Sequence, residues 1–448
     1  FAPPLCLVGE NIALLIANMF FREKENYELI FEPKLVFWTA VPVILFLLCF
    51  WIYPYFVGDD TYVLATSLRE SIQANKIIQP FSDRRPFFTP LVVFLKTALG
   101  LSIKNILIFV LPLGAILSFM SPLAILKKQI TKNWWLGIWS VVFLASPYLF
   151  FQLQYAIPQS LVLVFTYPVL MLLTLAVKEQ NYIFFSTAFL FSALSLGFHE
   201  LGAILLACSF IAFITMIFRS AKTDWRKTLK GLFVAAIIIF PYLLIFHVFS
   251  KFKAISFIPK FLINNLPTKF HFEWWYVDYY LNPDGIVFSY PGIMGIFWYL
   301  FLGALVVFLF VLSLPFLKKK ISWLNFSNNL PLIFYLLILF FVAEIYPRFA
   351  KVAFLPERAW PFLAAGLSLL SVLLVSHCMK QKINFKAIKI LSAACLAFVL
   401  AGCSASIYLT TNRGLLLSKE ESAAIKYISQ EMPSDAVIVS PQSYNENI

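Results

Sequence analysis

Long apolar segments separated by short polar connections dominate this chain. A helix of roughly 17 to 25 apolar residues can cross the ~30 Å hydrocarbon layer of a membrane. Segments of this kind lie at 1–20, 35–55, 104–126, 135–151, 156–178, 182–198, 200–218, 231–249, 291–316, 331–347, 358–378 and 389–410. The pattern predicts an all-α polytopic membrane protein with about twelve transmembrane helices.

Composition supports this interpretation and excludes a soluble globular domain. Of the 448 residues, 61% are hydrophobic and only 13% are charged. The net charge of +13 could indicate a nucleic-acid partner, but polytopic proteins gather Lys and Arg in cytosolic loops. We therefore attribute the charge to membrane topology and anionic lipid, and predict no nucleic-acid partner. The six cysteines lie in apolar runs without the spacing of zinc ligands.

The connections alternate in charge, which predicts the topology. Basic connections should face the cytosol, and the others should face outward across a plasma (inner) membrane. The outward set comprises residues 56–103, 250–290, 346–357 and everything after 410. The basic connections carry Lys127, Lys128, Lys132, Lys178, Arg219, Lys222, Arg226, Lys227, Lys230, Lys318, Lys319, Lys320, Lys380, Lys382, Lys386 and Lys389.

The first outward loop opens with two adjacent carboxylates, Asp59 and Asp60, where an apolar segment ends. Neighbouring carboxylates repel each other and require water, cations or strong hydrogen-bond donors. We interpret the pair as the candidate chemical centre. The structural alternative is a solvated start of the helix that follows, because Asp is a favourable residue at helix N-termini.

Two in-plane helices are predicted in the same loop. After Asp60, the apolar residues Val63, Leu64, Leu68 and Ile72 recur at helical spacing among polar residues, which is typical of a helix lying in the membrane interface. A second apolar helix is predicted near 88–100. The polar stretch between them carries the cations Arg84 and Arg85.

Further polar groups lie at the predicted outer ends of spans. His199 and Glu200 mark the outward turn between two spans, and we consider both a second polar site and a plain hairpin turn. Arg358, Arg348 and Lys351 are candidate phosphate contacts. An arginine side chain matches phosphate oxygens, and Arg358 also precedes a helix N-terminus. The alternative is that these cations snorkel from helix ends.

Two outward regions have their own predicted character. The aromatic run in 250–290 indicates interfacial anchoring, with stacking on a sugar ring or contact with a lipid chain as the alternative. After residue 410, a helix over Ser418–Glu431 and a strand over Ala436–Ser440 are predicted. We therefore divide the chain into a multi-span membrane domain, 1–410, and the truncated start of an outward soluble α/β domain, 411–448.

Four features of the chain stand out: a span that ends in Gly58-Asp59-Asp60, in-plane helices in the same loop, a late Glu357-Arg358 and an outward C-terminal segment. Together they resemble the GT-C superfamily of membrane glycosyltransferases. The resemblance covers the whole chain in layout, but its sharp motif is two residues. The resemblance implies a sugar donor linked to polyprenyl phosphate or diphosphate, an acceptor hydroxyl of unknown identity, and inversion at the anomeric carbon. One departure is the apolar segment 1–20 before the span that precedes the acidic loop.

The resemblance also implies roles for the site residues. Asp59 or Asp60 would act as general base or as a metal ligand. The two carboxylates would hold a divalent cation, Mg²⁺ or Mn²⁺, together with donor phosphate oxygens, or one Asp would instead stay protonated. Arg358 would contact the donor phosphate, with Arg348, Lys351, Arg84 and Arg85 as competing candidates. A cation there would stabilise the departing phosphate, while a carboxylate would accept the proton of the attacking hydroxyl.

Two other functions compete with this hypothesis. A transporter or flippase for a lipid-linked or small polar substrate would show internal repeats and polar residues near mid-membrane. The chain has no convincing repeat, and its ionisable residues gather at the predicted outer face, which favours an enzyme. A catalytically silent scaffold would tolerate replacement of Asp59 and Asp60.

Overall fold

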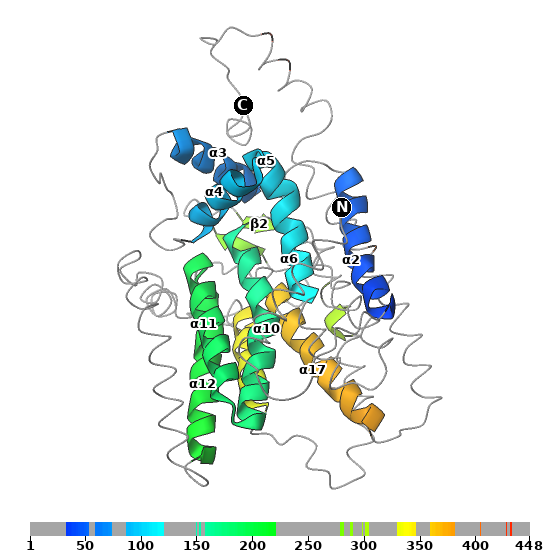
Figure 1. Cartoon of the computed structure of the whole chain (residues 1–448), viewed down its shortest axis with the longest axis vertical. Coiled ribbons are helices and arrows are strands. Elements are labelled where there is room, and N and C mark those ends of the chain that lie inside the picture. Colours follow the sequence, from blue (N-terminus) through cyan, green and yellow to red (C-terminus); the bar gives the residue numbers. More distant parts are fainter. Residues whose placement is uncertain are drawn as a thin grey trace.

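The computed structural model describes residues 33–52, 59–73, 87–120, 157–220, 278–281, 287–289, 329–345 and 359–380, together with 149, 152–153, 298, 301–303, 404, 427 and 431. This part of the chain is almost entirely helical (Figure 1). Its elements are α2 (Pro33–Ile52), α3 (Asp59–Gln73), α4 (Phe88–Leu99), α5 (Ile103–Asn105), the π-helical turn η1 (Ile106–Val110), α6 (Leu111–Met120), α10 (Pro158–Glu179), α11 (Tyr182–Phe198), α12 (Gly202–Ser220), β1 (Asp278–Leu281), β2 (Val287–Ser289), α16 (Leu330–Phe340), the π-helical turn η3 (Phe341–Ile345) and α17 (Trp360–Lys380).

Helices α10, α11, α12, α16 and α17 form the centre of the molecule, and α10 contacts each of the others. The chain reverses between α10 and α11 at Gln180, which adopts the left-handed conformation with φ of 53°. Asn181 then begins α11, because its side-chain oxygen accepts hydrogen bonds from the backbone N–H groups of Ile183 and Phe184. A short turn at His199–Leu201 leads directly into α12.

Length and apolar composition allow two described helices to cross a membrane unaided, the segments Pro158–Glu179 and Gly202–Arg219. The apolar helices Tyr182–Phe198, Leu330–Ile345 and Trp360–Ser371 are shorter. Predicted spans 35–55, 104–126, 156–178, 182–198, 200–218, 331–347 and 358–378 overlap helices in the part of the chain that the structure describes, with non-helical residues only at their N-terminal ends. The predicted spans 1–20 and 231–249 lie outside the described residues, as do almost all residues of 135–151, 291–316 and 389–410.

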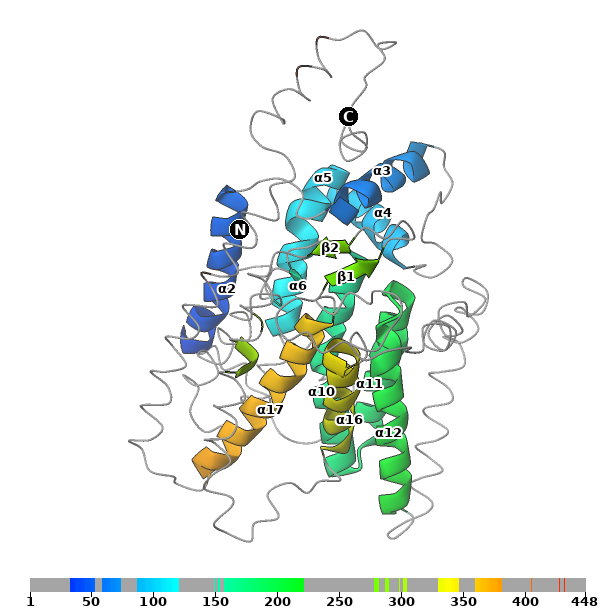
Figure 2. The same ribbon diagram turned by 180° about the vertical axis from the view of Figure 1, so that it is seen from behind.

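Helices α3 and α4 lie across one end of this bundle, as predicted for the first outward loop (Figures 1 and 2). The axis turns by 112° between Phe88–Leu99 and the segment Ile103–Leu117, with Gly100 in the left-handed conformation at the break. Leu64 and Leu68 of α3 pack with Phe88 and other apolar residues in one cluster, while Arg69 and Glu70 are exposed. This amphipathic pattern confirms the sequence-based prediction for α3.

Basic residues gather at the opposite end of the bundle. Ile157, directly before α10, belongs to the same apolar cluster as α3 and α4. At the other end of α10, the carbonyl oxygen of Val177 accepts a hydrogen bond of 3.0 Å from the guanidinium of Arg219. Lys178 lies in the same last turn. Lys178 and Arg219, from two connections predicted to face the cytosol, therefore lie at the end of the bundle opposite α3 and α4.

The aromatic region 250–290 contains an antiparallel hairpin that the hydrophobic pattern did not predict. Strand β1 pairs with β2 through Asp278 opposite Ser289 and Leu281 opposite Val287, with an irregularity in the register between the two pairs. In the sequence, the residues Pro283-Asp284-Gly285, which are of types that favour turns, were the available signal. Beyond residue 410, Tyr427 and Glu431 are helical and exposed, and the predicted strand lies outside the described residues.

Candidate functional site

Asp59 and Asp60 are the first two residues of α3, at the end of the bundle that carries the in-plane helices. The positive end of a helix dipole stabilises carboxylates in a first turn. Asp60 precedes Leu64 by four residues, which is about 6 Å along a helix axis. Because Leu64 and Leu68 are buried at 7% and 1% exposure, the acidic turn is carried by an anchored helix.

Helices α3 and α4 together are called the in-plane layer. A close contact fastens this layer to the end of α11. The N–H of Phe87, directly before α4, donates a hydrogen bond of 3.2 Å to the carbonyl oxygen of Gly197. A Cβ atom at Gly197 would lie 2.1 Å from Cδ2 of the Phe87 ring, so only glycine fits without a shift. The same ring meets Phe198 edge to face, with centroids 5.9 Å apart. The start of α4 is therefore packed against the residues that lead into the turn at His199.

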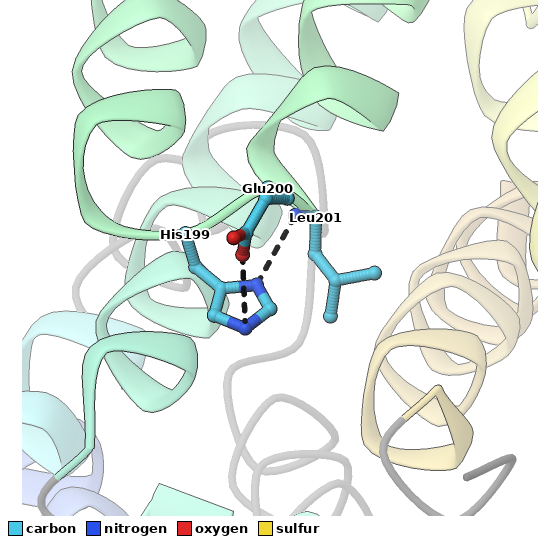
Figure 3. Close-up of polar contacts among 3 residues, drawn as sticks. All are labelled: His199, Glu200 and Leu201. Carbon is cyan, nitrogen blue, oxygen red and sulfur yellow. Dashed lines mark hydrogen bonds and ion pairs between the residues drawn. The ribbon is translucent and has the colours of Figure 1, made fainter. Parts of the chain in front are cut away.

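His199 and Glu200 face each other within that turn (Figure 3). His199 Nε2 lies 3.4 Å from Glu200 Oε2, and the two residues are only 9% and 8% exposed. His199 Nδ1 accepts a hydrogen bond of 3.2 Å from the N–H of Leu201, which places the proton of a neutral ring on Nε2, toward the carboxylate. These contacts are local to residues 199–201, as in a turn that caps the following helix.

A buried carboxylate that the sequence analysis did not single out lies in η3. Glu344, with 7% exposure, accepts hydrogen bonds at Oε1 from Trp298 Nε1 at 2.9 Å and Trp360 Nε1 at 3.2 Å. The two indole rings stack with centroids 5.1 Å apart and planes 13° apart. The signal was present in the chain: Glu344 is a lone carboxylate in the apolar run 331–347, where ionisable residues are costly.

Comparisons with known proteins identify the fold. No protein-family model matches the chain, and a search of curated proteins finds no match. The crystal structure of ArnT from Cupriavidus metallidurans in the apo state superposes with a TM-score of 0.52 and 12% identity, covering 90% of this chain and 81% of that one. ArnT is a GT-C membrane glycosyltransferase. This chain shares the fold of ArnT.

A second solved structure also matches the chain, with a lower TM-score. The cryo-EM structure of the arabinosyltransferase EmbB from Mycobacterium smegmatis is 14% identical, with a TM-score of 0.42 and coverage of 97% of this chain. The chain matches 48% of the length of EmbB. The fold assignment rests on ArnT, and it confirms the resemblance to GT-C proteins as a resemblance of fold.

Two groups of predicted site residues lie in the part of the chain that the structure describes. Asp59 and Asp60 lie at the in-plane layer, and the turn of His199 and Glu200 is fastened to that layer through Phe87. The predicted cations lie outside the described residues, namely Arg84, Arg85, Arg348, Lys351 and Arg358. In the sequence, two of these cations lie close to described residues. Arg85 precedes Phe87 by two residues, and Arg358 precedes Trp360 by two residues.

Proposed function

We propose that this chain is a membrane glycosyltransferase that moves a hexosyl or pentosyl group from a polyprenyl-phosphate-linked donor to an acceptor hydroxyl. The observation that carries the proposal is an acidic pair in the first turn of an anchored in-plane helix, at one end of a bundle with the GT-C fold. We place this end on the extracytoplasmic face of the plasma membrane, in a protein of about twelve spans followed by a soluble α/β segment, and we assign the reaction to cell-envelope glycosylation.

The proposed chemistry is a direct displacement. Asp59 or Asp60 accepts the proton of the acceptor hydroxyl as its oxygen attacks the anomeric carbon, and the bond to the donor phosphate breaks with inversion. Arg358 is the preferred cation for the departing phosphate, with Arg348, Lys351, Arg84 and Arg85 as further contacts. An arginine there keeps its charge at any physiological pH.

A divalent cation fits the acidic pair only with help from the donor. Within the part of the chain that the structure describes, no group of three or more His, Cys, Asp and Glu side chains could hold a metal ion. Mg²⁺ commonly binds through one or two carboxylates together with substrate phosphates. Mg²⁺ or Mn²⁺ held by Asp59, Asp60 and phosphate oxygens would neutralise charge on the leaving group. We expect EDTA to lower transfer and Mg²⁺ or Mn²⁺ to restore it.

The test is glycosyl transfer in membranes that contain the intact protein, supplied with labelled polyprenyl-phosphate sugars. Asp59→Asn and Asp60→Asn keep side-chain size and remove the base, so at least one should lose about 10²-fold or more in rate. Glu70→Gln is the matched control, because Glu70 is an exposed carboxylate on the same helix.

Membrane-inserted amounts of each variant are measured in the same preparations. Loss of transfer in an inserted aspartate variant, with Glu70→Gln unchanged, supports the proposal. Full activity in both aspartate variants, or no consumption of any donor by the parent, refutes it.

A further inference from the structure

Helix α5 brings a cation to the helix that begins with the acidic pair. Lys104 lies in α5 and is exposed. The short helix α5 packs against α3, and the two lie side by side in both views of the molecule (Figures 1 and 2). Asp59 and Asp60 are the first two residues of α3. The sequence analysis did not single out Lys104, because it lies at the edge of a long apolar run.

One apolar cluster positions both charged segments. Leu64, four residues after Asp60, and Leu107, three residues after Lys104, are buried in this cluster at 7% and 1% exposure. Ile103, directly before Lys104, packs against the same cluster. Asp60 and Lys104 therefore each lie about one helical turn, ~5 Å along a helix axis, from shared packing. Together with the contact between α3 and α5, this places Lys104 beside the acidic turn.

The bend before α5 sets the depth of Lys104 in the membrane. Helix α4 lies across the end of the bundle, whereas η1 and α6 continue from α5 into it, and the axis turns by 112° between Phe88–Leu99 and Ile103–Leu117. A corner between an in-plane helix and a spanning helix lies at the level of the lipid head groups, which lysine side chains favour. The phosphate of a polyprenyl-linked donor lies at this level too, because its polyprenyl chain occupies the hydrocarbon layer.

The other cations of α3 and α4 fit a phosphate at the acidic turn less well. Arg69 is exposed on α3, but it follows Asp60 by nine residues, which is about 14 Å along the helix axis. Lys96, in the last turn of α4, is half-buried. A phosphate beside two carboxylates requires a nearby cation to offset the repulsion between like charges. Lys104 combines exposure with a place beside the start of α3.

We infer that Lys104 binds the donor phosphate beside Asp59 and Asp60. This inference rests on the proposed function, and it names a phosphate contact within the part of the chain that the structure describes. A lysine ammonium binds phosphate as a compact point charge with three N–H donors. It stays protonated while the bond between the anomeric carbon and the phosphate oxygen breaks, and it offsets the negative charge on the departing phosphate.

The test measures binding of labelled polyprenyl phosphate, the donor without its sugar, to the purified full chain in lipid nanodiscs. Lys104→Gln removes the charge and should weaken binding about tenfold, the value of one hydrogen bond to a charged group, with a matching rise in the donor KM. Lys104→Arg keeps a cation and should bind within about threefold of the parent. Arg69→Gln is the matched control, because it removes an exposed cation from the same region, and it should bind as the parent does.

Two further measurements separate a donor site from general effects. Thermal unfolding in the same nanodiscs should give Lys104→Gln a midpoint near that of the parent, because the side chain is exposed. Nanodiscs of zwitterionic lipid and nanodiscs rich in an anionic phospholipid should show the same tenfold difference between parent and Lys104→Gln. Weakening that only tracks lost stability, equal weakening in Arg69→Gln, or a difference that anionic phospholipid abolishes overturns the inference, the last because Lys104 would then bind any lipid phosphate.

The parent protein distinguishes this inference from the proposed function. A parent that neither transfers sugar nor binds polyprenyl phosphate refutes the function and the inference with it. A parent that does both, while Lys104→Gln binds as it does, refutes the inference alone. A parent that binds polyprenyl phosphate through Lys104 but transfers no sugar from any donor refutes the function and leaves Lys104 as a phosphate contact.

Discussion

Replacement of Gly197 by alanine should destabilise the protein by pushing the in-plane layer away from α11. The added Cβ would lie 2.1 Å and 2.2 Å from Cδ2 and Cε2 of the Phe87 ring, far inside van der Waals contact. Overpacking of this kind costs about 1 to 3 kcal/mol. Because alanine is favoured over glycine within a helix by about 0.5 to 1 kcal/mol, the expected net loss is up to about 2.5 kcal/mol.

Gly114 provides the matched control for this substitution. It also lies within a helix, α6, and a Cβ atom there would meet nothing within 4 Å. Gly114→Ala should therefore be neutral or stabilising by up to about 1 kcal/mol. The assay compares the midpoints of thermal unfolding of the two variants and the parent in one detergent, and hydrogen exchange should show faster opening of α4 in Gly197→Ala alone.

Phe87→Ala completes a double-mutant cycle with Gly197→Ala. Removing the ring removes the obstacle, so the alanine at 197 should cost less in the Phe87→Ala background than in the parent. The expected coupling is of the same size as the clash, about 1 to 3 kcal/mol. Additive effects, or a Gly197→Ala protein as stable as Gly114→Ala, would refute the proposed contact between Phe87 and Gly197.

Two further predictions concern the packing of α11. Asn181→Ala removes the side-chain acceptor for the N–H groups of Ile183 and Phe184 and should lower the free energy of unfolding by about 1 kcal/mol. Asn181→Ser should recover most of this loss, and equal losses in the two variants would contradict the capping role. Ser192 and Ser209 share a hydrogen bond of 2.9 Å between α11 and α12. In unfolding measurements, the double-mutant cycle of Ser192→Ala and Ser209→Ala should give a coupling free energy of about 0.6 kcal/mol. A coupling of zero would show that the hydrogen bond contributes nothing to stability.

Local patterns predicted the elements of this fold well. The predicted span 182–198 matches α11, and polar residues mark both ends in the sequence: the stretch Lys178-Glu179-Gln180-Asn181 before it and the pair His199-Glu200 after it. The orientation of α3 follows from the spacing of its apolar positions. The acidic pair was singled out as a candidate site for the same reason, since two adjacent carboxylates after an apolar span are a local anomaly.

Contacts between distant residues were not predictable in the same way. The pairing of Phe87 with Gly197 spans 110 positions of the sequence, and that of Trp298 with Glu344 spans 46. Hydrophobic periodicity states which face of a helix is buried, but it does not state which residue covers that face. Glu344 itself was detectable as a lone charge, while its two indole donors required the folded structure.

Leu68→Ala offers a way to separate anchoring of the acidic turn from its chemistry. Leu68 is 1% exposed in the cluster that holds α3 against α4, and truncation of such a residue costs about 2 to 5 kcal/mol. Because the substitution leaves Asp59 and Asp60 in place but loosens their helix, activity should fall together with thermal stability and should recover on cooling.

Asp60→Asn should behave in the opposite way, because the change precedes the anchor by about two turns of helix and leaves Leu68 untouched. If Asp60 is the base, activity should fall at every temperature while the unfolding midpoint stays near that of the parent. If Asp59 is the base, Asp59→Asn should show this behaviour instead. A catalytic role for the acidic turn would be excluded if both amide variants lost activity only in step with stability, as Leu68→Ala does, because the carboxylates would then serve the start of α3 and not the reaction.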